Sequence, residues 1–216
     1  MFKKSFLTGT VVLIIVYFIT SSWAAELSSI KLPPPNLNSG KSLMQSLQAR
    51  KSSRDFSTKK LPVEVLSNLL WATDGINRPE SGKRTAPSAM GRQEIDIYIA
   101  MVDGLYLYNA QEHALKPVIK QDIRELTGKQ TFVKDAPVNL IYVADYSRMS
   151  RGSVEERNFY SAADTAFIAQ NVYLYCASEG LATVVRGSID RDVLAKAMQL
   201  RDNQKIVLSQ TVGYSK

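Results

Sequence analysis

The stretch Tyr160-Ser-Ala-Ala-Asp-Thr-Ala-Phe-Ile-Ala-Gln-Asn-Val-Tyr-Leu-Tyr-Cys-Ala-Ser-Glu-Gly180 is the longest uninterrupted helical pattern downstream of residue 24. Apolar and small residues recur in it at steps of three and four and fill most of the circumference, which is typical of a buried helix. The recurring residues are Ala163, Ala166, Phe167, Gln170, Leu174 and Ala177, with Ala162, Ala169, Val172, Tyr173 and Cys176 around them. Gly180 suits a left-handed C-cap. The pattern predicts a core helix around which the other elements pack.

The rest of the chain begins with helical patterns and then changes to a period of two. From Glu94 onward, Ile95, Ile97 and Ile99 share one predicted strand face, and Asp103-Gly104 is a hairpin signal. We expect helices at 42–49, 61–74, 121–126 and 190–200, strands at 94–101, 105–108, 115–118, 138–144, 181–185 and 205–212, a long loop at 76–92 and a polar segment at 147–156. Helices followed by a hairpin and then mixed elements predict an α+β domain.

The first 24 residues have the layout of a secretory signal peptide. Lys3 and Lys4 form a positive region, the apolar run 7–19 follows, and Ser22-Trp23-Ala24 provides a cleavage position. The run is short for a membrane-spanning helix, which needs about 20 residues; a retained anchor is the alternative. We therefore expect a periplasmic or secreted protein with an extended lead-in at 25–41 and one domain at 42–216.

Composition argues against several functional classes. Cys176 is the only cysteine and His113 the only histidine, so the sequence predicts neither a metal site nor a Ser-His-Asp triad. The net charge of +7 is not gathered into a basic stripe, so a nucleic-acid partner is not expected. No catalytic side chain stands out. If the protein is an enzyme, a cofactor should supply the chemistry.

One short segment has the composition of a phosphate site. Arg50-Lys51-Ser52-Ser53-Arg54 places three cations and two hydroxyls just beyond a predicted helix. Guanidinium groups bind phosphate through two hydrogen bonds, and lysine and serine add a charge and a neutral donor. A solvated basic turn is the other interpretation. Composition alone leaves both open.

Several stretches read in order resemble the nitroreductase-like FMN flavoprotein family, in particular its SagB-type dehydrogenase branch. The stretches are Arg50-Lys-Ser-Ser-Arg-Asp-Phe56, Leu69-Leu-Trp-Ala-Thr-Asp-Gly-Ile-Asn-Arg78, Arg84-Thr-Ala-Pro-Ser-Ala89, and Ala169-Gln-Asn-Val-Tyr-Leu174 with Gly180-Leu181. The resemblance covers roughly residues 42–214. It implies a homodimer with a mixed or antiparallel sheet surrounded by helices, a central buried helix, and FMN at the subunit interface.

The resemblance also implies roles for individual residues. Arg50, Ser52 and Arg54, with Lys51 beside them, would hold the FMN phosphate and ribityl chain. Pro87, Ser88 and Ala89 would pack against the isoalloxazine ring of the partner subunit, and the Arg186-Gly187 turn would present backbone groups near the reactive nitrogen of the flavin. On the central helix, Gln170 and Asn171 would be buried amides that need partners.

These features lead to two functional hypotheses. The first is an exported, homodimeric FMN-dependent oxidoreductase acting on a small molecule. The second is a catalytically silent dimer of the same fold that binds a flavin or another ligand. Azoline oxidation on peptides is a weaker third alternative. Reduced nicotinamides are cytoplasmic, so an exported enzyme needs another electron donor, which the sequence does not identify. The chain ends at Lys216, where family members often add another basic residue.

Overall fold

The computed structural model describes residues 26–216, so the predicted signal peptide lies outside the described residues. In chain order the helices and strands are β1 (Ile30–Lys31), α1 (Leu43–Ala49), α2 (Val63–Asp74), β2 (Ile76–Arg78), β3 (Lys83–Arg84), β4 (Ile95–Met101), β5 (Gly104–Asn109), β6 (Ala114–Ile119), β7 (Val138–Asp145), α3 (Val154–Glu179), β8 (Ala182–Arg186), α4 (Arg191–Ala197) and β9 (Gln204–Gly213). Short 3-10 helices are η1 (Ala89–Gly91), η2 (Arg124–Thr127), η3 (Thr131–Lys134) and η4 (Tyr146–Arg148).

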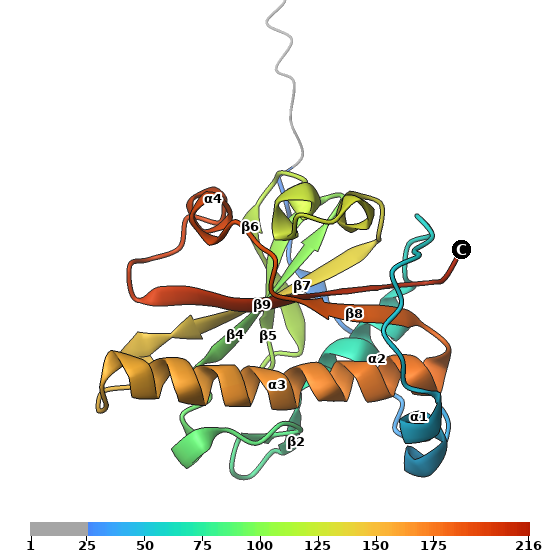
Figure 1. Cartoon of the computed structure of the whole chain (residues 1–216). Coiled ribbons are helices and arrows are strands. Elements are labelled where there is room, and N and C mark those ends of the chain that lie inside the picture. The colour runs from blue at the N-terminus through green and yellow to red at the C-terminus, as the bar shows by residue number, and fades with distance from the viewer. Residues whose placement is uncertain (1–25) are drawn as a thin grey trace, which may run out of the picture.

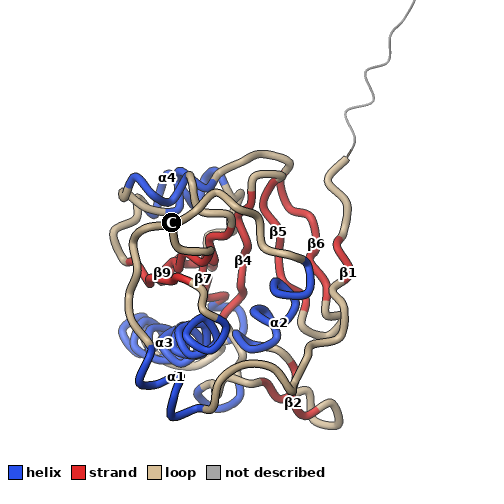
Figure 2. Tube along the Cα trace, turned by 90° about the vertical axis from the view of Figure 1, so that its right-hand side faces the viewer, coloured by secondary structure: helices blue, strands red, loops and turns tan. Residues whose placement is uncertain are grey.

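A seven-stranded sheet organises the molecule. Its strand order is β1-β6-β5-β4-β7-β9-β8, and every neighbouring pair in it is antiparallel. The long helix α3 crosses one face of the sheet and α4 lies on the other, as Figure 1 shows. The side view in Figure 2 places α1, α2 and α3 in one layer beneath the strands. The predicted α+β class is confirmed.

Both faces of the sheet are buried because β4 alternates apolar residues toward two cores. Ile97 and Ile99 pack in the cluster that contains α2 and α3, whereas Tyr98 and Ala100 pack with Leu194 of α4. This is the period of two expected from the sequence. The next strand, β7, is buried along its whole length, which its continuous apolar run predicted.

The helix α3 is longer and less completely buried than its sequence predicted. It begins at Val154 with a capping box formed by Ser153 and Glu156, so the segment 147–156 ends in ordered helix rather than remaining a polar loop. Gly180 caps it in the left-handed conformation, as expected. The face on the sheet consists of Ser161, Asp164, Thr165, Ile168, Ala169, Val172, Tyr173 and Cys176. Phe159 and Phe167 lie on the exposed face.

Three other expectations need adjustment. The loop 76–92 contains a small hairpin of β2 and β3 and the 3-10 helix η1. The helix expected at 121–126 is reduced to η2. The strand expected to end at Val185 includes Arg186, because Arg186 pairs with Ser209 of β9. Short local patterns do not carry the pairing information that decides such boundaries.

The lead-in is held by a small polar cluster. Ser67 donates its hydroxyl to the carbonyl of Pro33 at 2.5 Å and also contacts Nε2 of His113 at 2.7 Å. Nδ1 of His113 is 2.9 Å from the hydroxyl of Tyr108, and burial lowers the histidine pKa. The single histidine therefore connects the lead-in, α2 and β5 through hydrogen bonds, and its role is structural.

Candidate functional site

The basic segment 50–54 is docked onto β8 and the C-terminal half of α3. The amide of Ser53 donates to the carbonyl of Thr183 at 2.9 Å, which fixes the backbone of the segment to the edge strand. The guanidinium carbon of Arg50 lies 5.3 Å from the centroid of the Tyr173 ring. The backbone of the segment is therefore fixed, while the side chains of Lys51, Ser52 and Arg54 remain exposed.

Tyr173 links this segment to the strand behind it. Its hydroxyl accepts a hydrogen bond from the amide of Val185 at 3.0 Å and lies 2.8 Å from Oγ of Ser52. Because the amide of Val185 donates to the phenol oxygen, the phenol can donate its own O–H in a hydrogen bond to Oγ of Ser52. The serine hydroxyl can then donate to an anion. Successive hydrogen bonds of this kind strengthen one another.

A cavity of about 320 Å³ opens beside this arrangement. It is lined by Lys41, Ala49, Lys51, Ser53, Tyr173, Cys176, Ala177, Gly180, Leu181, Thr183 and Ser215. Two lysines, three serine or threonine hydroxyls and the Tyr173 phenol in one hollow suit an anionic ligand. A separate cavity of about 430 Å³, lined by Leu61, Leu66 and Met101 among others, contains none of the predicted site residues.

The Pro87-Ser88-Ala89 turn lies elsewhere, against the middle of α3. Pro87 is exposed, Oγ of Ser88 accepts from the amide of Gln93 at 3.0 Å, and the amide of Ala89 donates to Oδ2 of Asp164 at 2.9 Å. Residues 164 and 173 are nine apart, which is about 14 Å along a helix. In a single chain, therefore, the structure does not bring the turn and the basic segment together.

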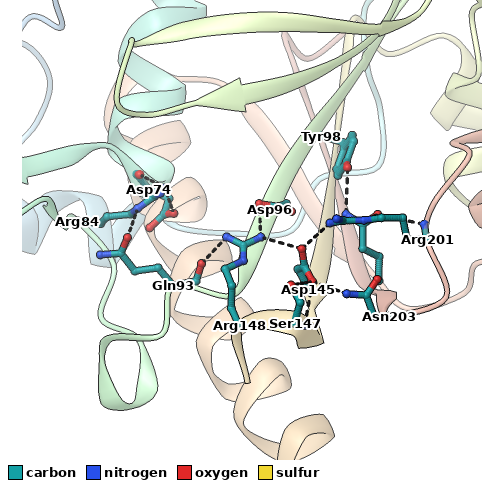
Figure 3. A network of polar contacts seen from close by, with 11 residues as sticks. Asp74, Arg84, Gln93, Asp96, Tyr98, Asp145, Ser147, Arg148, Arg201 and Asn203 are labelled. Atoms are coloured by element: carbon teal, nitrogen blue, oxygen red, sulfur yellow. Dashed lines mark hydrogen bonds and ion pairs between the residues drawn. The ribbon is translucent and has the colours of Figure 1, made fainter. Parts of the chain in front are cut away.

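A network of polar side chains fixes both ends of this turn (Figure 3). Arg84 forms an ion pair with Asp74 at 2.7 Å and donates from Nε to Oε1 of Gln93 at 3.1 Å. Arg148 donates to the carbonyl of Gln93 at 2.8 Å. Burial raises the pKa of Asp74 to about 7, and Arg84 opposes that rise. These contacts hold a backbone in which Met90 and Gln93 both have positive φ, a conformation that costs about 1 kcal/mol or more per residue.

The neighbouring residues Arg186 and Gly187 have different environments. The Arg186 side chain is 5% exposed and donates to the carbonyl of Thr127 at 2.6 Å and to Oδ1 of Asn139 at 3.0 Å. Burial lowers its pKa to about 10. The guanidinium is thus occupied in fastening η2 to the sheet, and only the backbone of the predicted Arg186-Gly187 turn is left for a ligand. Gly187 is exposed.

Other residues singled out by the sequence have simpler environments. Cys176 is fully buried and its thiol pKa is raised by burial, as expected for a small apolar residue. Gln170 is exposed and Asn171 only partly covered, so the buried amides expected on α3 are not found within one chain. Between residues 26 and 216, no cluster of three or more His, Cys, Asp or Glu is arranged to hold a metal ion, and no helix is long and apolar enough to cross a membrane.

Sequence reasoning missed three residues of this region. The sequence pattern assigns Tyr173 only a packing role on the circumference of the buried helix. It assigns no site role to Glu94 or Asp164. A signal existed on α3, where Ser161, Asp164 and Thr165 interrupt an otherwise apolar pattern. Polar residues on the inner face of a helix need partners, but the sequence does not say which face is inner.

The chain belongs to the nitroreductase family, whose profile matches residues 47–214. A structure from Ralstonia eutropha JMP134, described provisionally as a nitroreductase, is 44% identical with a TM-score of 0.84, over 88% of this chain and 90% of that one. The protein MJ1384 of Methanocaldococcus jannaschii, also described provisionally as a nitroreductase, is 29% identical over 71% of this chain and 82% of its own.

The fold extends to characterised flavin enzymes. The NADPH:FMN oxidoreductase of Vibrio harveyi, solved with NAD⁺, has a TM-score of 0.61 at 18% identity, over 81% of this chain and 69% of that one. At this identity the likeness concerns the fold. The family expected from the sequence is confirmed, and the SagB-type branch within it stays a prediction.

Proposed function

We propose that this chain is an exported, homodimeric FMN-dependent oxidoreductase acting on a small molecule. The observation that carries the proposal is the docked segment 50–54, in which Tyr173 joins Ser52 to the backbone of β8. Three cations and the hydroxyl of Ser52 occur together there, next to a cavity whose lining includes Lys51 and Tyr173. Such a combination suits a phosphorylated cofactor. Family membership and the fold shared with an FMN oxidoreductase support the same conclusion.

The residues present fit FMN. Arg50, Lys51 and Arg54 would neutralise the phosphate, and Ser52 would donate its hydroxyl to a phosphate or ribityl oxygen. The backbone at residues 185–187 would lie along the ring. When bound, FMN supplies the redox chemistry, whereas the residues of this chain bind the cofactor, orient it and limit access of water. We assign no acid or base role to any side chain.

The homodimer is part of the proposal because one chain offers only half of the expected site. The exposed face of α3 carries Phe159 and Phe167, which are 68% and 50% exposed, and on α1 Leu43 and Met44 are 63% and 73% exposed. Large apolar groups gathered on neighbouring elements are typical of an interface. As the family resemblance implies, the Pro87-Ser88 turn of the second copy would lie beside the first copy's segment 50–54.

Replacing the two arginines tests the cofactor site. We expect the Arg50→Ala/Arg54→Ala variant to lose FMN while remaining folded and dimeric, because it removes two of the three cations that neutralise the phosphate. The measurement is the visible absorption spectrum of the purified mature protein before and after addition of FMN, with flavin release on denaturation as a second readout.

An Arg151→Ala/Lys205→Ala variant is the matched control, since it removes two exposed cations from loops and strand ends away from the segment. It should retain FMN. Unchanged flavin affinity in the first variant would refute the phosphate assignment. A colourless wild-type protein that does not take up FMN would refute the oxidoreductase proposal and leave the silent ligand-binding dimer.

A further inference from the structure

Glu94 is a buried carboxyl group without a well-formed hydrogen bond. It directly precedes β4 and is 0% exposed, and neither of its carboxyl oxygens has a hydrogen-bond partner of good geometry among residues 26–216. The Ser161 hydroxyl and the backbone amide of Glu94 act to lower its pKa, but burial outweighs them. An isolated carboxylate in such a place costs several kcal/mol, and proteins usually avoid that cost by keeping the group protonated. Burial does raise the pKa of Glu94, and the neighbouring carboxyl of Asp164 raises it further.

Asp164 is the group that connects this carboxyl to the predicted site. It is 2% exposed, and its Oδ2 accepts the amide of Ala89 at 2.9 Å. Ala89 follows the exposed Pro87 and the partly buried Ser88. Asp164 therefore interacts both with Glu94, whose pKa it raises, and with this turn. Unfavourable backbone conformations follow the turn at Met90 and Gln93.

We propose that Glu94 and Asp164 share one proton, and that this shared proton positions the Pro87-Ser88-Ala89 turn. Glu94 donates its O–H to Asp164, and the Asp164 carboxylate accepts that bond together with the amide of Ala89. Both are charge-assisted hydrogen bonds, which are about twice as strong as neutral ones. A role of this turn in flavin binding rests on the proposed function. The shared proton is independent of that function.

None of the nearby cations between residues 26 and 216 forms an ion pair with Glu94 or Asp164, although Nε of Arg157 is buried without a hydrogen-bond partner. The groups around the pair are Asp74 on α2, Arg84 on β3, Tyr146 and Arg148 on η4, and Ser161 and Arg157 on α3. Arg84 is paired with Asp74 and Arg148 with Asp96. No ion pair joins Arg157 to Glu94 or Asp164 in the described part of the chain. Loss of the proton would leave carboxylates facing each other in the core, with Asp74 close by.

The pair makes stability and turn order dependent on pH in a defined direction. The folded-state pKa of Glu94 lies above its ordinary value of 4.5, so its contribution to stability is complete below that value. The contribution is lost as pH rises through the folded-state pKa. Over this interval the unfolding equilibrium constant increases by about tenfold per pH unit for one such proton. Glutamine at this position mimics the protonated acid and should remove that dependence.

The decisive experiment compares wild type with Glu94→Gln, Asp164→Asn and the control Glu80→Gln, which makes the same change at an exposed loop position. In a series of rising pH from 4.5, the infrared difference spectrum between wild type and Glu94→Gln should contain a protonated carboxyl band that shifts in D₂O. This band should persist to higher pH than the corresponding band for the control. Urea unfolding should depend less on pH between about 5 and 9 in Glu94→Gln than in wild type.

Hydrogen exchange at the amide of Ala89 tests the positioning role. Its protection factor should fall by about tenfold in Asp164→Asn, which loses a charge-assisted acceptor. In Glu94→Gln the protection factor should not fall as the pH rises. FMN affinity should follow the same pH profile. Absence of the carboxyl band, or equal pH slopes in urea, overturns the shared proton. Unchanged Ala89 exchange in Asp164→Asn overturns the positioning. All these readouts except affinity remain valid in a protein that binds no FMN, so the two proposals fail separately.

Discussion

At the scale of single residues, Tyr173 does more than its place in a helical pattern suggests. Its ring lies beneath Arg50, and its hydroxyl connects Ser52 to the backbone of Val185. A phenol provides an apolar body for the core and a polar end for the site, so one side chain stabilises the fold and orients a donor. Phenylalanine would keep the first property and lose the second.

We expect Tyr173→Phe to weaken FMN binding by about fivefold to tenfold with little change in fold. The amide of Val185 loses its acceptor and Ser52 loses its orienting partner, and one hydrogen bond is worth about 1 kcal/mol. Flavin titration by fluorescence quenching measures the affinity. Tyr175→Phe, two residues along the same helix, removes the phenol that donates to the carbonyl of Val65. It is the matched control and should leave affinity unchanged; equal losses in both would contradict the role of Tyr173.

At the scale of elements, α3 has two faces that carry apolar residues, and the two faces have different surroundings. One face packs on the sheet, and the other, with Phe159 and Phe167, stays exposed in the single chain. A helix that is apolar nearly all round usually lies in a core, but the burial of its second face can come from another subunit. In the proposed homodimer, the partner subunit would bury the face that is exposed in one chain.

The exposed face of α3 predicts that charge will dissociate the dimer. We expect Phe167→Glu to convert the protein to a monomer, because an unpaired carboxylate buried at an interface costs several kcal/mol. Sedimentation velocity gives the mass directly. Val193→Glu on α4 is a control of equal exposure, 49% against 50%, on the opposite face of the sheet. A monomeric wild type, or a dimer unaffected by Phe167→Glu, would contradict the interface.

At the scale of the whole molecule, cellular location decides which electron donor the protein can meet. The first 24 residues predict export, and the absence of an Arg-Arg pair before the apolar run predicts export in an unfolded state. FMN would then be acquired after export. The electron donor would not be a cytoplasmic nicotinamide.

We expect the exported protein to begin at Ala25. Cleavage after Ala24 follows from the small residues at 22–24 and removes Lys3 and Lys4, so the net charge falls from +7 to +5. N-terminal sequencing of protein recovered from the periplasm or medium checks the cleavage site. Replacing Ala24 with a bulky residue should block processing, whereas the same change at Ser28 should not. Protein retained in the cytoplasm with Met1 in place would contradict the signal peptide.

Much of the fold could be predicted because its signals are local. The capping box at Ser42 and Gln45, the alternation along β4 and the apolar run of β7 each report the environment of their own residues. The family was recognised from motifs in fixed order. Other features depend on pairing between segments that are distant in the sequence, and a local pattern contains no information on such pairing. These features are the strand order, the reduced helix η2 and the extension of β8 through Arg186.

The sequence by itself determined the α+β class, the family and the residue types of a candidate phosphate site at 50–54. Only the tertiary structure decided that Tyr173 contacts Ser52, that Arg186 donates to Thr127, and that the buried Asp164 accepts the amide of Ala89 and raises the pKa of Glu94. The physical reason is that periodicity records whether a residue is apolar, whereas the partner of a buried polar group depends on which elements meet in space. The central helix was predicted from its apolar residues, and its few polar residues connect it to the proposed site.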